Sequence, residues 1–85
     1  MDVYLLNSFK RVSRKNEKIY YFVTLMFNDT TCEIIVNENT YNYILATYHQ
    51  FDLIDESDYK LTPFVSTDKE SGRRYLNFRF TFNLN

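Results

Sequence analysis

Hydrophobic positions recur with a period of two along much of the chain, which is typical of β-strands that bury one face. The alternation is best in residues 73–84 and nearly as clear in residues 18–27. In residues 18–27 one face consists of Ile19, Tyr21, Val23, Leu25 and Phe27, and the other of Lys18, Tyr20, Phe22, Thr24 and Met26. Both segments are therefore predicted to be strands with one face toward a core.

Three further segments are predicted to be strands: residues 3–9, 31–36 and 59–66. Pro63 has no backbone N–H, so we expect the strand at 59–66 to lie at an edge or to be irregular. Polar loops are expected at 11–17 and 66–72. Gly72 is expected to supply a positive φ angle in the second loop, because glycine has no Cβ.

The period changes after residue 36, where apolar side chains recur at i, i+3, i+4 and i+7. These positions are Tyr41, Ile44, Leu45 and Tyr48. This spacing predicts one stripe of an α-helix. Asn37 or Asn39 is expected to cap its N-terminus, and the helix is expected to end near residues 49–51.

The resulting order is β-β-β-α-β-β, so the fold class is mainly β with one helix. This is the element order of the OB-fold, a small five-stranded Greek-key barrel, and we predict an OB-like barrel. Closure into a barrel also suits a short chain because it reduces exposed strand edges. An SH3-like barrel and an open α+β sheet are the alternatives.

The composition bounds the class of protein. A chain of 85 residues with 45% hydrophobic and 25% charged residues is expected to form one globular domain, residues 1–85. No apolar run approaches the roughly 20 residues of a membrane span, and the start of the chain does not resemble a signal peptide. A single cysteine, Cys32, forms no internal disulfide. These features favour a cytoplasmic protein.

The net charge of −1 hides a strong asymmetry. Residues 1–31 carry five Lys or Arg and three Asp or Glu, which gives +2, and residues 59–85 carry five and two, which gives +3. Residues 32–58 carry six acidic residues and no Lys or Arg, which gives −6. Both ends of the chain are therefore basic and its middle is acidic.

An OB-fold commonly binds its ligand across strands 2 and 3, between the loops that join strands 1–2 and 4–5. In this sequence the first of these loops is basic, the second carries Lys69 and opens into Arg73 and Arg74, and the strands next to them carry outward aromatic residues. Lys and Arg neutralise phosphates, and aromatic rings stack on bases. We therefore predict a binding surface for single-stranded nucleic acid made of Arg14, Lys15, Lys18, Tyr20, Phe22, Lys69, Arg73, Tyr75 and Arg79.

The element order, the segment "NEKIYYFVTLMF" after a basic loop and the C-terminal "GRRYLNFRFTF" resemble small single-stranded-DNA-binding proteins of phages and mobile elements. The gene V type is the nearest in size. This resemblance covers most of the chain as a pattern, without an invariant motif. It implies an OB-like fold and cooperative, sequence-tolerant binding of single strands, often as a homodimer.

The alternative function is that of a small phage-type inhibitor, similar to an anti-CRISPR protein, that binds a host protein through Tyr, Phe and Arg side chains. An acidic patch would then serve as a second contact, formed by Asp52, Asp55, Glu56 and Asp58. The sequence contains no Ser/His/Asp set, no glycine-rich phosphate loop and no cysteine pair. We therefore expect no catalytic residues, no metal site and no cofactor.

Tyr75 and Arg79, which are part of the predicted binding surface, have a structural alternative. They could form a cation–π pair with each other on the surface.

Overall fold

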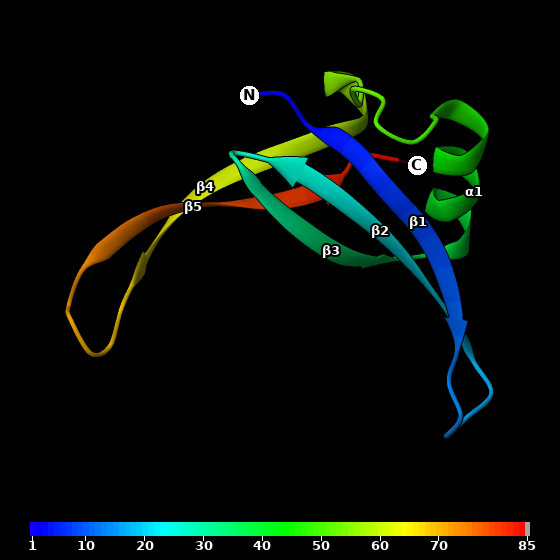
Figure 1. The fold of residues 1–85 in the computed structure, drawn as a ribbon, viewed down its shortest axis with the longest axis horizontal. Helices are drawn as coiled ribbons and strands as arrows, with labels where there is room; N and C mark the ends of the chain where they lie inside the picture. The colour runs from blue at the N-terminus through cyan, green and yellow to red at the C-terminus, as the bar shows by residue number, and fades with distance from the viewer. Residues whose placement is uncertain (85) are drawn as a thin grey trace. The chain divides into compact units, whose positions relative to one another are not determined.

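The computed structural model describes residues 1–84, which contain five strands, one α-helix and one short 3-10 helix (Figure 1). The elements are β1 (Tyr4–Val12), β2 (Ile19–Phe27), β3 (Thr30–Val36), α1 (Glu38–Thr47), η1 (Glu56–Asp58), β4 (Tyr59–Thr67) and β5 (Arg74–Phe82). The strands pair in two antiparallel sheets, β1-β2-β3 and β4-β5. The chain divides into two compact units, residues 1–54 and the part from Asp55 onward, and each is described on its own.

The first unit is a three-stranded meander joined by two tight hairpin loops. Asn28 and Asp29 form the β2–β3 turn, and both have positive φ angles, 53° and 57°. Asn and Asp tolerate this conformation, which matches the right-handed twist of a hairpin. The β1–β2 register shifts between Leu5 and Asn7, so the alternation of β1 is interrupted there.

The core of this unit lies between α1 and one face of the sheet. Val23 and Leu25 of β2 and Ile44 of α1 are all 0% exposed. The rings of Tyr21 and Tyr41 are 4.9 Å apart and join the helix to the sheet. Burial, followed by the charge of Glu38 and a hydrogen bond to it, raises the pKa of Tyr21 above its ordinary value.

After the helix, the chain returns along the first residues of β1. The N–H of Phe51 donates to the carbonyl of Leu5, and the N–H of Ile54 donates to the carbonyl of Val3 (2.6 and 2.8 Å). Leu5 in turn donates to the carbonyl of Asp52 (2.9 Å). These backbone bonds satisfy part of the outer edge of β1 and bury Ile54, which is 1% exposed.

The second unit is a long hairpin of two nine-residue strands, β4 and β5. One face is apolar near η1, where Phe80 stacks on Tyr59 with ring centroids 5.2 Å apart and meets Phe82 edge-on at 4.7 Å. The same face becomes open toward the loop, where Val65 and Leu76 are each 61% exposed. The hairpin therefore holds its closest ring packing at the end where its chain termini lie.

Several expectations from the sequence are confirmed. The chain is mainly β with one helix, and each expected strand is present with ends that differ by at most three residues. Asn37 caps α1 by accepting the Thr40 N–H at 2.8 Å, and Gly72 has a φ of 73°. Pro63 lies in β4, which pairs only with β5, so it occupies an edge strand.

Two details of the helix were wrong. It ends at Thr47, before residues 49–51, because Tyr48 adopts extended dihedral angles while its N–H still donates to the carbonyl of Ile44. Leu45 is 52% exposed although it lies on the predicted stripe.

Strand pairing closes no barrel within residues 1–84. The OB-like barrel and the single OB-like domain therefore stay predictions.

Candidate nucleic-acid interface

The sheet face opposite α1 in the first unit carries aromatic and basic side chains. The register places Phe9 opposite Phe22 and Arg11 opposite Tyr20, so these four side chains project from the same face of β1 and β2. Val23 and Leu25 alternate with them and point toward the helix, where they are buried. The period of two in β2 thus separates the core from a surface that faces away from it.

Two stacked rings form the centre of this surface. Phe9 and Phe22 lie with centroids 5.0 Å apart and an interplanar angle of 13°. The guanidinium carbon of Arg11 lies 5.1 Å from the Phe9 centroid and 6.0 Å from that of Phe22. Contact of a cation with ring faces is attractive and restricts the guanidinium to one place. Arg11 is itself exposed, so its N–H donors remain at the surface.

The β1–β2 loop is short and is held by several hydrogen bonds of its own backbone. The N–H of Ser13 donates to the carbonyl of Lys18 at 2.8 Å, and the N–H of Glu17 donates to the carbonyl of Ser13 at 2.9 Å. The Asn16 side chain accepts the Lys18 N–H at 3.0 Å and donates to the Tyr20 hydroxyl at 3.4 Å. This network fixes the loop and ties it to the exposed ring of Tyr20.

The loop of the second unit is built in a similar way. The N–H of Asp68 donates to the carbonyl of Arg73, and the N–H of Gly72 donates to the carbonyl of Asp68, both at 2.9 Å. The Asp68 carboxylate accepts the Glu70 N–H at 2.9 Å. This backbone bond, followed by the Ser71 hydroxyl, lowers the pKa of Asp68 below its ordinary value.

The polar face of the β4–β5 hairpin carries Tyr75, which is 48% exposed, and Arg79. Arg79 lies over the ring of Phe64 on β4, 5.7 Å from its centroid. The alternative of a Tyr75–Arg79 pair is wrong, because residues four apart in a strand are separated by about 13 Å. The Asn77 side chain donates to the Ser66 hydroxyl and fills the space between them.

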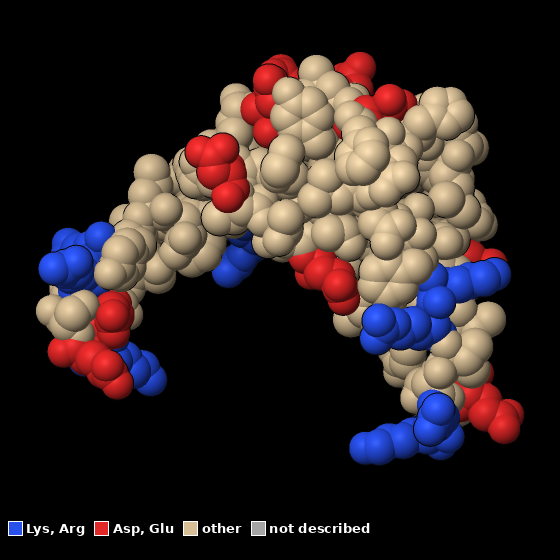
Figure 2. Space-filling view, in the orientation of Figure 1, with Lys and Arg blue, Asp and Glu red and all other residues tan. Residues whose placement is uncertain are grey.

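The cations of both loops lack acidic partners. Among residues 1–84, none of the side chains of Arg14, Lys15, Lys18, Lys69 and Arg73 forms an ion pair. All five are exposed. Figure 2 shows Lys and Arg side chains at the loop ends of the hairpins, with acidic groups among them. These positive charges are therefore available to an external anion.

The structure groups the predicted site residues by unit. Arg14, Lys15, Lys18, Tyr20 and Phe22 come together on the β1–β2 hairpin, whereas Lys69, Arg73, Tyr75 and Arg79 lie on the β4–β5 hairpin. Phe22 is half-buried because its ring stacks on Phe9. The prediction omitted Phe9, Arg11 and Phe64. The strand register was the missing information, since it decides which residues of two strands are neighbours.

The residues of the acidic patch have local structural roles. The Asp52 carboxylate accepts the N–H of His49 at 2.8 Å directly after α1. The Asp55 carboxylate caps η1 by accepting the N–H and the hydroxyl of Ser57 at 2.9 and 2.8 Å, which lowers the pKa of Asp55. Glu56 and Asp58 are in η1. Part of the negative charge in this segment therefore serves to end one helix and begin another.

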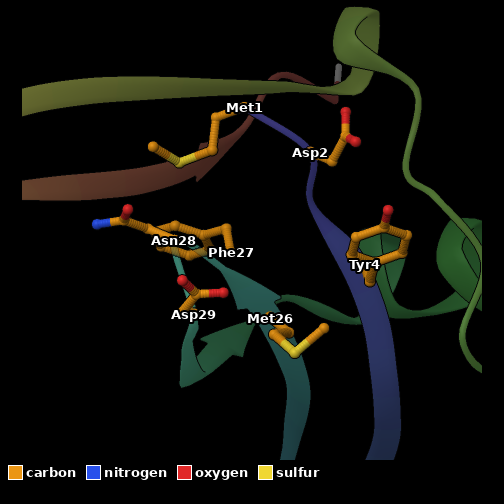
Figure 3. A pocket seen from close by; sticks show the side chains of 7 residues that line it. All are labelled: Met1, Asp2, Tyr4, Met26, Phe27, Asn28 and Asp29. Carbon is orange, nitrogen blue, oxygen red and sulfur yellow. The ribbon is translucent and has the colours of Figure 1, made fainter.

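An open pocket of about 200 Å³ lies at the other end of the first unit, near the start of β1 and the β2–β3 turn (Figure 3). Its lining is formed by Met1, Asp2, Tyr4, Met26, Phe27, Asn28 and Asp29.

Within residues 1–84 no group of three or more potential metal ligands is present. The same residues include no helix with the length and apolar character needed to cross a membrane.

Comparison with protein-family models gave no match, and neither the curated proteins nor the solved structures contained a similar chain.

Proposed function

We propose that this protein is a non-enzymatic binder of single-stranded nucleic acid. The observation that carries the proposal is the combination of fixed loops, unpaired cations and exposed tyrosines at the loop end of each hairpin. A loop that only needed to be soluble could balance its charges internally. The first loop does not, because Arg14, Lys15 and Lys18 stand beside a single acid, Glu17. In the second loop Lys69 and Arg73 stand beside Asp68 and Glu70, and the excess positive charge of that hairpin lies on its strands.

The ligand chemistry follows from these groups. Single strands expose phosphates, which Lys and Arg neutralise, and flat bases, which stack on aromatic rings for about 1–3 kcal/mol per base. Tyr20 is 38% exposed and Tyr75 is 48% exposed, so each ring can be reached by a base. Such binding is tolerant of sequence because every base has a π-face.

The roles of the residues can be separated. Arg14, Lys15, Lys18, Lys69 and Arg73 contact phosphates, and Tyr20 and Tyr75 stack on bases. Phe22 stacks on Phe9 within the same sheet face and is half-buried there. Arg79 lies over the ring of Phe64 with its charge at the surface. An OB-like barrel, in which the loops joining strands 1–2 and 4–5 flank the ligand, is the finer form of the proposal.

The test is fluorescence anisotropy with a labelled oligo-dT over a series of salt concentrations. With about four phosphates contacted, the slope of log affinity against log salt is expected to be near −3, because each contact releases a condensed counterion. Lys18→Gln is the test variant. Lys60→Gln is its control, because it removes the same single positive charge from an exposed position on β4 outside both loops. This control is expected to leave the slope unchanged.

An affinity for oligo-dT that does not depend on salt would contradict the proposal. So would an equal effect of Lys60→Gln and Lys18→Gln. If the chain binds no oligonucleotide but captures a host protein from nuclease-treated lysate, the inhibitor function takes its place, with Tyr, Phe and Arg side chains as the contacts.

A further inference from the structure

The two basic hairpins have the same construction when residue numbers are shifted by 55. β1 and β4 each have nine residues and begin at Tyr4 and Tyr59, and β2 and β5 each have nine residues and end at Phe27 and Phe82. The loops between them, 13–18 and 68–73, both have six residues. The sequences of the hairpins therefore align without a gap, and their strand pairings coincide from the loops out to Asn7 and Thr62, beyond which β1 has a register shift that β4 lacks.

Four hydrogen bonds recur at the same positions of the two loops. Ser13 donates its N–H to Lys18 as Asp68 does to Arg73, and Glu17 donates to the carbonyl of Ser13 as Gly72 does to that of Asp68. The side-chain oxygen of the first loop residue accepts the N–H of the third, at Ser13 and Lys15 in one loop and at Asp68 and Glu70 in the other. The side-chain oxygen of the fourth residue accepts the N–H of the sixth, at Asn16 and Lys18 and at Ser71 and Arg73. The fifth residue has a positive φ in both, 57° at Glu17 and 73° at Gly72.

Part of the exposed chemistry corresponds as well, although loop 13–18 has a net charge of +2 and loop 68–73, with Asp68 and Glu70, has a net charge of zero. The second and sixth loop residues are basic in both hairpins, Arg14 and Lys18 in one and Lys69 and Arg73 in the other. A tyrosine follows two residues after each loop, at Tyr20 and Tyr75. A phenylalanine lies four residues before the first residue of each loop, at Phe9 and Phe64, and an arginine lies over each ring, Arg11 from β1 and Arg79 from β5. These two arginines are not related by the shift of 55.

We infer that the chain carries two equivalent binding sites for single-stranded nucleic acid, one on each hairpin, which arose as an internal repeat. This inference rests on the proposed function and states how many sites carry it. Each site consists of two basic loop residues for phosphates and one tyrosine for a base. An arginine held on a phenylalanine adds a third positive charge on the tyrosine face.

The equivalence has a physical consequence for binding. Because both loops present their cations from the same backbone conformation, each should contact about two phosphates. Two sites on one chain also convert the second contact with a long strand into an intramolecular step, which raises the affinity without new contacts. A short oligonucleotide that fills one site lacks this gain.

The experiment compares three double variants of the full chain. Arg14→Gln with Lys18→Gln removes two charges from the first loop, and Lys69→Gln with Arg73→Gln removes two from the second. Lys10→Gln with Lys60→Gln is the matched control, because it removes one charge from each hairpin outside the loops. All six side chains are exposed, so folding should be retained, and far-UV circular dichroism checks this for every variant.

Each loop variant is expected to reduce the magnitude of the salt slope by about 1.4, since a single-strand phosphate contact contributes about 0.7. The affinity for a long oligo-dT should fall by similar factors for both, roughly tenfold or more. The control should keep the wild-type slope. The two sites should also bind two molecules of a short oligo-dT per chain.

Three outcomes would overturn the inference while the proposed function stands: one loop variant carries the whole change in slope, the loop variants match the control, or a short oligonucleotide binds with a stoichiometry of one. Absence of oligonucleotide binding by the wild-type chain would instead overturn the proposed function itself. A loop variant that unfolds is replaced by its single substitutions, Arg14→Gln and Lys69→Gln, which should still agree with each other.

Discussion

The fifth residue of each hairpin loop offers a pair of opposite perturbations. Glu17 has a φ of 57° and Gly72 a φ of 73°, so both lie in the left-handed region. Residues with a Cβ are disfavoured there by about 1–2 kcal/mol, whereas glycine enters it freely. The first loop therefore carries strain that the second avoids. We predict that Glu17→Gly stabilises its loop and that Gly72→Ala destabilises the other.

The magnitudes follow from the surroundings of each residue. A Cβ built on Gly72 meets no atom within 4 Å, so the cost of Gly72→Ala is purely conformational, about 1 kcal/mol. Glu17→Gly recovers a similar amount but loses part of it to the greater freedom of glycine in the unfolded chain, which leaves a gain of about 0.5–1 kcal/mol. The control Glu17→Gln removes the charge and keeps the strain.

Amide hydrogen exchange measured by NMR gives a local readout for each loop. The N–H groups of Ser13 and Asp68 close the two loops through bonds of 2.8 and 2.9 Å. A change of 1 kcal/mol in local opening alters exchange about fivefold. Exchange at Ser13 should slow in Glu17→Gly, and exchange at Asp68 should accelerate in Gly72→Ala. The reasoning is refuted if Glu17→Gly protects Ser13 no better than Glu17→Gln does, or if Gly72→Ala leaves Asp68 unchanged.

Three further predictions concern other parts of the chain. Tyr20→Ala should weaken oligo-dT binding by about 1–3 kcal/mol in an anisotropy titration. Tyr43→Ala on α1 removes a ring of the same 38% exposure and should not, so equal losses would exclude stacking at Tyr20. Ile44→Ala should lower the free energy of unfolding in urea by about 2–5 kcal/mol because Ile44 is 0% exposed, whereas Leu45→Ala, at a 52% exposed position, should cost far less; similar costs would contradict the described core. The pKa of Asp68 is lowered by bonds formed in the folded loop, so its stabilisation is present above the ordinary aspartate value of 3.8 and is lost as the pH falls through the lowered pKa. The Glu70 amide resonance should report this step below pH 3.8, and the Lys15 amide, which donates to a Ser13 hydroxyl, should not show it.

The strands could be read from the sequence because their hydrophobic period is strong. In β2, the alternation of Val23 and Leu25 with Tyr20 and Phe22 matches the buried and outward faces. Gly72 could be placed because it is the only glycine and stands in a polar loop. These features depend on local residue preferences, which a single sequence contains.

The interactions between strands could not be read in the same way. The stack of Phe9 on Phe22 and the position of Arg11 over it depend on the β1–β2 register, which a one-residue slip would change. The exposure of Leu45 depends on which side of α1 meets the sheet. The correspondence of the two hairpins rests on conformations at Glu17 and Gly72 that their residue types do not share.

The most direct test of the account is an NMR titration of the isotope-labelled chain with a short oligo-dT. Amide shifts are expected to change in both loops, 13–18 and 68–73, and at Tyr20 and Tyr75, with similar saturation curves, while α1 stays unaffected. Shift changes confined to α1 or to the acidic residues 52–58, with both loops silent, would contradict it.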